Sequence, residues 1–262
     1  TVSVLYWCGP MSKSSYDQLL SIFSPEGSLY QVEYSYKAVK AAGITAVAIR
    51  AKDGVVVVSQ RKVPDKLIKP ESVTNVFNVD GRIGAAVIGR VPDGRLVLDW
   101  ARDKAYKYKY DCGHPIGAQL LAKRLAGMAQ YNTQTAQHRA MGVSVTLFSI
   151  EKDDKKGGAL APQLYKVDPS GHFVGYFAVA SGAKETEAQQ QLEKAAKAQG
   201  PFGEMSLQQA SDVALATLQH VCGEALKGKD VEMACVSAER PEYHTVGAEQ
   251  IDAMLTAIAE RD

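Results

Sequence analysis

The order of strand and helix patterns along the chain is the feature that most limits its fold. Short runs of apolar and β-branched residues form groups, and amphipathic helix patterns lie in pairs between these groups. The order is strands, two helices, strands, two helices, strands and a final helix. Helix pairs segregated from antiparallel strands are typical of α+β folds, whereas doubly wound parallel sheets alternate strand and helix. We therefore expect a four-layer αββα sandwich, in which two antiparallel sheets are flanked by helix pairs.

Turn residues and helix-start residues mark the individual elements. Lys52-Asp53-Gly54 and Asp80-Gly81 separate apolar runs, so each predicts a hairpin, and the four strands involved are expected to form an antiparallel sheet. Asp93 is expected to cap the first long helix and Pro115 to begin the second. The charged, glycine-rich stretch 151–162 is expected to be a solvated loop. The expected strands are 44–50, 55–60, 73–79, 83–88, 143–150, 163–167, 173–180, 232–237 and 243–246, and the later helices are 184–198, 206–226 and 248–260.

An amphipathic helix pattern at 28–43 precedes the first strand. The tetrapeptide SPEG at 24–27 comes before it, with Pro and Gly at the spacing that a β-turn favours. Ser28 and Gln31 have the spacing of a capping box, and Gly43 stands where many helices end in a left-handed glycine. The pattern alone favours a helix that packs on its own domain, and the alternative is an added device for assembly or gating. The apolar face consists of Leu29, Val32, Tyr36 and Val39.

These patterns divide the chain into three parts. Residues 1–27 are expected to form an N-terminal tail and turn, and residues 28–43 an N-terminal helix. Residues 44–262 are expected to form a single αββα domain, because no linker and no internal repeat interrupts them.

Composition argues against nucleic-acid and membrane partners. The 262 residues are 46% apolar and 23% charged, and their formal net charge is +1, so no strong attraction to nucleic acid or anionic lipid is expected. No apolar run approaches the roughly 18 residues of a membrane span. The four cysteines are scattered, which is typical of reduced thiols in the cytosol or nucleus. We expect neither nucleic acid nor membrane as a partner.

The sequence contains no clear site for a metal or a cofactor. The five histidines lie far apart, and neither a phosphate-binding loop nor a nucleophile elbow is present. Ser181 and Lys184 match a Ser-x-x-Lys pattern without its companion motifs, so they are interpreted as a turn between strand and helix. Alternating Lys and Tyr residues at 104–110 favour a solvated helix face with buried aromatic stems over a base-stacking platform. No cofactor and no metal site is predicted.

One stretch carries a resemblance to a known family. The segment 24–39, SPEGSLYQVEYSYKAV, resembles the N-terminal signature of the alpha-type subunits of the proteasome. Similar landmarks follow in order from 62–67 to the Asp-Pro-Ser-Gly turn at 168–171, so the resemblance covers about residue 16 to the C-terminus. Within the family, residues 63–67 and the C-terminal stretch 251–262 are most similar to the eukaryotic type-6 alpha subunits, at the first alpha position in systematic ring order. The resemblance implies an N-terminal-nucleophile hydrolase-like fold and a location in cytoplasm and nucleus.

The resemblance also implies that the catalytic site is absent. The related beta-type subunits begin directly at their first strand with a nucleophilic threonine, whose own amine serves as base. Thr1 of this sequence precedes the first expected strand by more than forty residues. Alignment places Ile44 at the nucleophile position, Gln60 at that of the structural aspartate and Asn75 at that of the lysine. The chain is therefore expected to be non-catalytic; the alternative is an active N-terminal threonine hydrolase after processing near Gly43.

The implied role is structural and regulatory. Alpha-type subunits form seven-membered outer rings of the 20S particle, contact the beta rings, close the substrate pore with their N-terminal tails and bind regulatory particles. Matching positions give a gate cluster of Tyr16, Asp17, Pro25 and Tyr34. They also give an activator pocket that contains Asn75 and Gly89. Two departures are Gln18, where the family usually has arginine, and Asn75, where the pocket usually has lysine. With the resemblance included, the assembly and gating interpretation of 28–43 is favoured.

Overall fold

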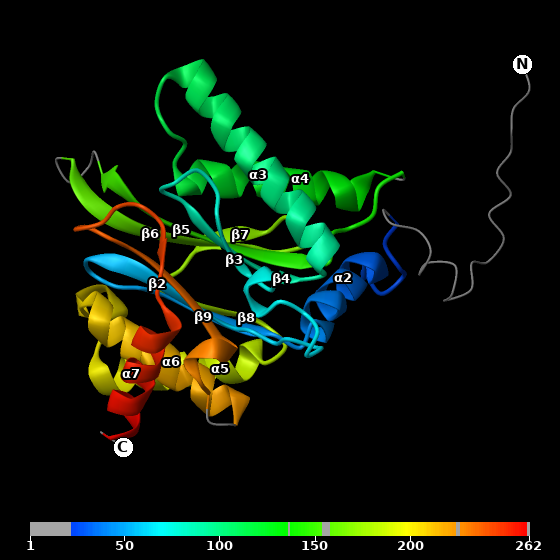
Figure 1. The fold of residues 1–262 in the computed structure, drawn as a ribbon. Coiled ribbons are helices and arrows are strands. Elements are labelled where there is room, and N and C mark those ends of the chain that lie inside the picture. Colours follow the sequence, from blue (N-terminus) through cyan, green and yellow to red (C-terminus); the bar gives the residue numbers. More distant parts are fainter. Residues whose placement is uncertain (1–21, 136, 154–157, 224–225, 261–262) are drawn as a thin grey trace, which may run out of the picture.

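Two antiparallel sheets form the centre of the molecule. The computed structural model describes residues 22–135, 137–153, 158–223 and 226–260, and Figure 1 shows the two sheets stacked between layers of helices. The predicted αββα sandwich is therefore confirmed. The first sheet has the order β10 (His244–Thr245), β9 (Val231–Ser237), β2 (Gly54–Gln60), β1 (Thr45–Arg50) and β8 (Ala178–Gly182). The second has the order β3 (Val76–Asn78), β4 (Gly84–Gly89), β5 (Val143–Asp153), β6 (Ala159–Val167) and β7 (Phe173–Gly175).

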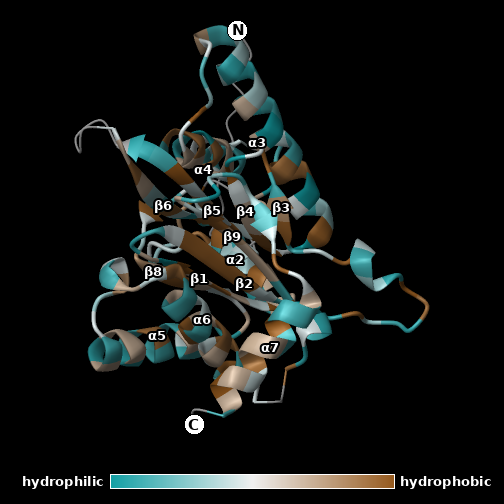
Figure 2. Ribbon diagram, turned by 60° about the vertical axis from the view of Figure 1, so that its left-hand side comes forward, coloured by the Kyte–Doolittle hydropathy of each residue, from teal (hydrophilic) through white to brown (hydrophobic). Residues whose placement is uncertain are grey.

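Helix pairs cover both outer faces of the sandwich, and an additional helix, α2, lies at one end (Figure 1). In Figure 2 the central strands are largely hydrophobic, whereas α5 is largely hydrophilic. No helix among the described residues is both long enough and apolar enough to span a membrane. The helices are α2 (Tyr30–Ala41), α3 (Val91–Cys112), α4 (Ala118–Gln134), α5 (Glu185–Gln199), α6 (Leu207–Cys222) and α7 (Ala248–Ala259), and short 3-10 turns lie at Pro70–Ser72, Phe202–Glu204 and Gly228–Asp230.

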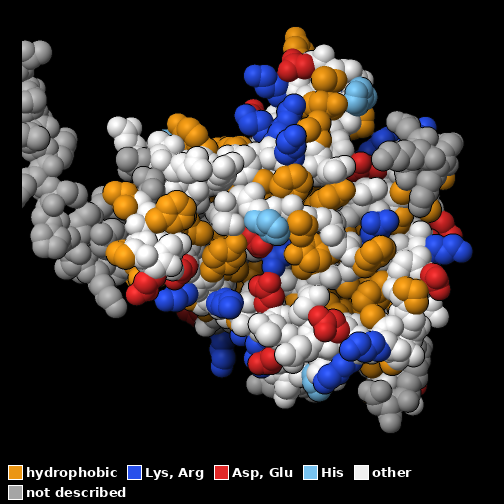
Figure 3. All heavy atoms as spheres, turned by 180° about the vertical axis from the view of Figure 1, so that it is seen from behind, with side chains coloured by type: hydrophobic (Ala, Val, Ile, Leu, Met, Phe, Trp, Pro, Cys, Tyr) orange, Lys and Arg blue, Asp and Glu red, His pale blue; other side chains and the backbone are white. Residues whose placement is uncertain are grey.

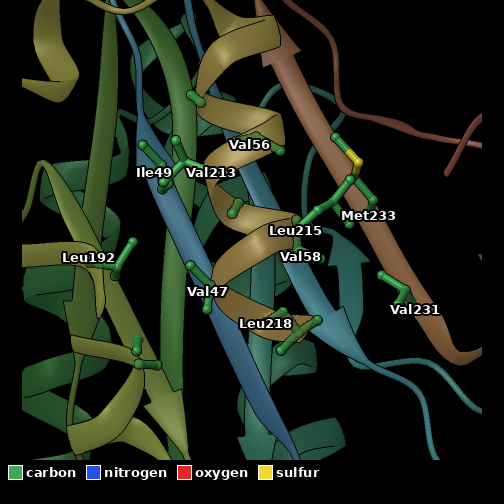
Figure 4. Close-up of a cluster of buried hydrophobic side chains, with 14 of the residues drawn as sticks. Val47, Ile49, Val56, Val58, Leu192, Val213, Leu215, Leu218, Val231 and Met233 are labelled. Atoms are coloured by element: carbon green, nitrogen blue, oxygen red, sulfur yellow. The ribbon is translucent and has the colours of Figure 1, made fainter. Parts of the chain in front are cut away.

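Strand alternation distributes the apolar residues between two cores. In β1, Val47 and Ile49 face α6, while Ala48 faces the other sheet. Figure 4 shows these two side chains on the side of the sheet where α6 carries Val213 and Leu218. Because both faces of a sandwiched sheet are buried, its strands are nearly continuous apolar runs rather than alternating patterns. A third core lies between α3, α4 and the outer face of the second sheet.

The hairpins formed as predicted, but their sheet membership differed from expectation. β1 pairs with β2 and β3 pairs with β4, yet the two hairpins belong to different sheets. The expected strand at 173–180 is two strands, β7 and β8, one in each sheet. Tyr176 N–H donates to Leu164 O in the second sheet, and the carbonyl of the next residue, Phe177 O, accepts from Arg50 N–H in the first. The chain therefore crosses between the sheets at this dipeptide.

Several predicted element boundaries were wrong. The N-cap residue of α2 is Leu29 rather than Ser28 and provides no side-chain cap, and Ser24 Oγ accepts from Ser28 N–H at 3.0 Å. The helix α4 begins at Ala118 rather than at Pro115, and Glu151 Oε1 accepts from the Ala118 N–H at 2.6 Å. The expected loop at 151–162 is shorter, since β5 extends to Asp153 and β6 begins at Ala159. Gly43 has φ +68°, consistent with its predicted role at the end of α2.

Candidate functional site

The end of the sandwich at which β1 begins is covered by α2. Val39 is the one fully buried apolar residue of this helix, and it packs with Ala46 of β1 and Ile88 of β4. The helix also contacts β5 and β8, so it spans both sheets. A Cβ atom added at Gly142 would lie 3.0 Å from Ala38 Cβ, which shows how closely α2 approaches the start of β5. In Figure 1, α2 closes one end of the sandwich.

Two side-chain hydrogen bonds hold α2 in this position. Lys62 Nζ donates to Gly43 O at 2.6 Å, where a positive charge also interacts favourably with the C-terminal end of the helix. The Tyr36 hydroxyl lies 2.9 Å from Ser170 Oγ, in the turn between β6 and β7. Burial raises the pKa of Tyr36 above its ordinary value, so this hydroxyl remains protonated near neutral pH. Tyr36, which was expected on the apolar face of the helix, thus lies at the protein surface and fixes α2 through a hydrogen bond.

The turn before α2 has the geometry that its sequence predicts. Gly27 N–H donates to Ser24 O at 2.8 Å, and Gly27 has φ +79°, a conformation that glycine adopts without strain. Pro25 is exposed at the tip of this turn, and Tyr34 is 38% exposed one helical turn into α2. Lys37 Nζ lies 5.1 Å from the centre of the Tyr34 ring. Of the predicted gate cluster, Pro25 and Tyr34 therefore face solvent, and Tyr16 and Asp17 lie outside the described residues.

The positions aligned with catalytic residues form a structural network. Asn75 Nδ2 donates to Gln60 O at 3.2 Å, so the structure brings these two predicted positions together. Asn75 N–H donates to Glu232 Oε2 at 2.7 Å, and Arg61 pairs with the other oxygen of Glu232 at 3.2 Å. A neutral amide and an arginine–carboxylate pair thus occupy the region aligned with the catalytic lysine and aspartate.

No nucleophile is available at the start of β1. Ile44 has a hydrocarbon side chain, and its carbonyl accepts from Ala183 N–H at 3.0 Å. The neighbouring Thr45 is buried, and its hydroxyl oxygen accepts from Lys184 N–H at 3.2 Å. Lys184 Nζ in turn donates to Val221 O at 2.6 Å, which confirms the structural interpretation of the Ser-x-x-Lys pattern. Within the described residues, no group of three or more His, Cys, Asp or Glu side chains could hold a metal ion.

The two predicted activator-pocket residues line the same small cavity, next to α3. Asn75 O accepts from Val87 N–H at 2.8 Å, which fixes the segment before β3 against β4. Gly89 has φ +141°, and a Cβ atom there would lie 2.1 Å from Gly142 O, so the floor of the cavity requires glycine. Arg90 and Arg95 also line the cavity, and sequence reasoning did not identify them.

A carboxylate buried in the first turn of α3 supports this floor. Asp93 accepts two hydrogen bonds from the Arg139 guanidinium, at 2.6 and 2.7 Å, and one from Gly142 N–H at 3.0 Å. The hydrogen bond from Arg139 lowers the pKa of Asp93, burial opposes this, and the Gly142 N–H lowers it further. The predicted capping role of Asp93 was wrong, since the N-cap position is Arg90 and carries no side-chain cap.

A polar cleft of about 780 Å³ lies between α2 and α5. At its floor Lys166, whose side chain is 6% exposed, donates to Glu185 Oε1 at 2.5 Å and lies 3.6 Å from Asp168 Oδ1. Burial lowers the pKa of Lys166, but the two carboxylates outweigh this effect and raise it overall. The pattern of β6 alone could not identify this buried charge, because its partners come from other elements.

The Lys and Tyr run at 104–110 lies near the end of α3. Tyr106 and Tyr110 are 72% and 80% exposed, so their rings are not the buried stems that the sequence indicated. Tyr108 is half-buried, with the Arg124 guanidinium 5.1 Å above its ring and His114 in edge contact. Figure 3 shows acidic and basic side chains interspersed over most of one face of the molecule.

Comparison with known proteins identifies the family. The family model described as "Proteasome subunit" matches residues 40–236, and the model of the N-terminal signature of A-type proteasome subunits matches residues 16–38. An alpha type-1 proteasome subunit from Trypanosoma brucei brucei is 42% identical, over 95% of this chain and 93% of its own length. An alpha type-6 proteasome subunit from Caenorhabditis elegans is 36% identical over 96% and 98%. A probable alpha type-1 proteasome subunit from Schizosaccharomyces pombe is 38% identical over 94% and 98%.

The signature match includes the turn and α2, the segment that covers the end of the sandwich. Alpha-type subunits are non-catalytic, in agreement with the side chains at positions 44, 60 and 75, and the alternative of an active threonine hydrolase is not supported. The chain belongs to the proteasome subunit family, as a non-catalytic alpha-type subunit with a structural role in the alpha ring of the 20S proteasome.

Proposed function

We propose that this chain helps to close the substrate pore of the alpha ring and to bind the regulatory particles that open it. The observation that carries the proposal is the position of α2 and its preceding turn over the end of the sandwich at which β1 begins. The turn that leads into α2 is closed by hydrogen bonds from Gly27 N–H to Ser24 O at 2.8 Å and from Ser24 N–H to Ser28 O at 2.9 Å. We expect the chain to contact other alpha subunits in a seven-membered ring and the beta-ring subunits.

The exposed side of α2 and its turn supplies the surface for neighbouring subunits. Phe23 is 65% exposed, and Tyr34 and Tyr36 are 38% and 36% exposed, so three aromatic side chains of this segment reach solvent. Aromatic residues are enriched in the centres of protein interfaces, because they bury a large area while losing few rotamers. We therefore assign α2 to ring contacts as well as to its own domain.

The gate cluster is proposed to consist of Tyr16, Asp17, Pro25 and Tyr34. Tyrosine hydroxyl and carboxylate groups form hydrogen bonds with each other, and a proline turn limits the backbone conformations beneath them. Such contacts stabilise an open arrangement only if they are stronger there than in the closed one. Gln18 in place of the usual arginine removes one charge from this region.

The cavity lined by Asn75 and Gly89 is proposed to receive the C-terminal tails of regulators. Its floor is rigid, because Gly89 and the Asp93–Arg139 pair fix the backbone around Gly142. Asn75 offers a hydrogen bond without charge, so a terminal carboxylate is bound more weakly by residue 75 than by a lysine.

The finer assignments are also proposals. We place the chain at the first alpha position as a type-6 subunit. The relatives carry both type-1 and type-6 names, so their names do not decide the subunit type. We propose residues 1–27 as the gate region, 28–43 as the N-terminal helix and 44–262 as the single domain. A location in cytoplasm and nucleus, with neither nucleic acid nor membrane as partner, accords with the net charge of +1.

Two measurements test this function. Affinity purification of the tagged chain, followed by native mass measurement and subunit identification, should recover a large particle containing other alpha and beta subunits; recovery of a lone monomer would refute the ring role. Cross-linking within that particle identifies the two flanking subunits and so tests the proposed position.

The gate role is tested by deleting the residues before Ser24 within the assembled particle. We expect a modest rise in basal hydrolysis of a small fluorogenic peptide, because the remaining tails still obstruct the pore. Hydrolysis after full opening by detergent serves as the control and should be unchanged. If basal hydrolysis stays at the level of the intact particle, this tail is not part of the barrier.

A further inference from the structure

A second cleft lies at the opposite end of the sandwich from α2. Its volume is about 560 Å³, within the range of roughly 300–1,000 Å³ that is typical of ligand sites. Three connections reach this cleft, namely the β3–β4 turn, the α3–α4 loop and the β9–β10 loop, together with the adjacent ends of β5 and β6 (Figure 1). The proposed gate and activator pocket are at the other end, so this cleft takes no part in them.

The charge in this cleft is unbalanced. Among the described lining residues the one carboxylate is that of Glu151, whose Oε1 accepts from Ala118 N–H at 2.6 Å and from the Ser149 hydroxyl at 2.5 Å. The first turn of α4 contains no acidic residue of its own, so Glu151 supplies the negative charge that stabilises this helix end. Arg82 and Lys152 line the same cleft, and neither forms an ion pair with any residue that the structure describes.

Asp80, in the same turn as Arg82, is also engaged. Asp80 Oδ1 accepts from the backbone N–H groups of Arg82 and Ile83, at 3.1 and 2.9 Å, and so stabilises its own turn. The cations therefore lie at the edge of the cleft without a described partner, in a position to attract an anionic ligand.

Several apolar residues also line the cleft. Leu160 is 40% exposed, and Pro115 and Pro241 line the walls beside it. The layer beneath consists of buried isoleucine side chains from three elements. These are Ile83, Ile116 and Ile150, which are 1%, 3% and 3% exposed.

We propose that this cleft binds an acidic peptide segment of a partner protein, with its carboxylates on Arg82 and Lys152 and an apolar side chain against Leu160 and the two prolines. The chemistry follows from charge complementarity, because the lining residues without an ion pair to any described residue are cationic and apolar residues line the same cleft. A segment carrying both kinds of side chain satisfies both parts of the surface, whereas a purely polar anion leaves Leu160 exposed to water. The lining comes from three loops and the ends of two strands, which suits an extended segment lying along the cleft.

The probe for this proposal is a short capped peptide of alternating Glu and Leu that carries one benzophenone group. It is photo-crosslinked to the intact particle, and the labelled residues are identified by mass spectrometry, which separates this chain from its neighbours. A peptide in which Lys replaces Glu is the matched control for charge. We expect cross-links on the α3–α4 loop or beside Leu160 with the Glu–Leu peptide, and not with the Lys–Leu peptide.

The variant is the double charge reversal Arg82→Glu/Lys152→Glu. Each exposed ion pair contributes modestly to the free energy of binding. We therefore expect the double variant to lose roughly tenfold or more in affinity for the Glu–Leu peptide at low ionic strength. The matched control Lys194→Glu/Lys197→Glu changes the net charge equally on α5, in another layer, and should bind the peptide as tightly as the unmodified chain. Incorporation into the particle shows that both variants fold. Equal binding by the two double variants, cross-links only outside the cleft, or equal labelling by the Lys–Leu peptide would overturn the proposal.

Discussion

Asp93→Asn tests whether one buried carboxylate holds the floor of the cavity lined by Asn75 and Gly89. The change keeps the shape of the side chain but removes its charge. The substitution removes the ion pair with Arg139, whose two hydrogen bonds are 2.6 and 2.7 Å long. It also weakens the hydrogen bond from Gly142 N–H, at 3.0 Å. Because Gly142 O is the atom beneath Gly89, this perturbation acts directly on the site.

The expected magnitude follows from the exposure of the two partners. Breaking a fully buried ion pair costs about 3–5 kcal/mol, because the remaining charge is left without solvent. Here the Asp93 side chain is 4% exposed but that of Arg139 is 57% exposed, so water replaces part of what Arg139 loses. We therefore expect the free energy of unfolding to fall by about 2–3 kcal/mol.

The same carboxylate predicts a dependence on pH. The pKa of Asp93 is lowered in the folded chain, first by the Arg139 hydrogen bond, so its stabilisation is complete above the unfolded pKa of about 3.9. As pH falls below that value and through the lower folded pKa, the carboxylate is protonated and the stabilisation is lost. The difference in stability between the unmodified chain and Asp93→Asn should therefore shrink below about pH 4.

Urea unfolding of the recombinant chain, followed by circular dichroism at several pH values, measures both effects. Asp103→Asn is the matched control on the same helix, since the Asp103 side chain is 64% exposed and its carboxylate lies 3.4 Å from Lys104 Nζ, which is itself partly exposed. The control should lie within about 0.5 kcal/mol of the unmodified chain. If Asp93→Asn is as stable as this control at neutral pH, the pair does not hold the floor, and the reasoning is refuted.

Three further substitutions test other contacts of the site and fold. Gly89→Ala places a Cβ atom 2.1 Å from a backbone oxygen at φ +141°, so we expect a loss of about 3 kcal/mol or more in urea unfolding, and wild-type stability would contradict this geometry. Tyr36→Phe removes the hydrogen bond to Ser170, so we expect faster hydrogen exchange in α2 and a fall of roughly 0.5–1.5 kcal/mol in the free energy of unfolding. Tyr106→Phe is the exposed control and should change neither hydrogen exchange nor the free energy of unfolding. Ser206→Ala removes a complete capping box at the start of α6 and should lower the thermal midpoint, for a loss of about 1 kcal/mol; an unchanged midpoint would show that the box is not stabilising.

Local chemistry explains the features that were correctly predicted. The Lys52-Asp53-Gly54 turn and its flanking apolar runs need only neighbouring residues to form a hairpin, and β1 and β2 pair there as expected. The same holds for Gly43, whose left-handed conformation ends α2. Long amphipathic stretches likewise predicted α3 to α7, because the helical period is visible within each segment.

Features that depend on distant partners were not predictable in this way. The apolar run at 173–180 reads as one strand, but Tyr176 and Phe177 hydrogen-bond to different sheets, so it is two. Glu151, 33 residues away along the chain, satisfies the start of α4 and so displaces it from Pro115. Each outcome was decided by a hydrogen bond whose partner has no fixed place in the local sequence.

The same distinction between local and distant determinants applies to the candidate site. Residue identity and short spacings suffice to predict the α+β class, the N-terminal signature with its turn and helix, and the absence of a nucleophile at Ile44. Only the tertiary structure decided that Asn75 reaches Gln60, that Asn75 and Gly89 line one cavity, and that Asp93 pairs with Arg139 instead of capping α3. The physical reason is that buried polar groups must find partners, and folding brings those partners from elements far apart in the chain.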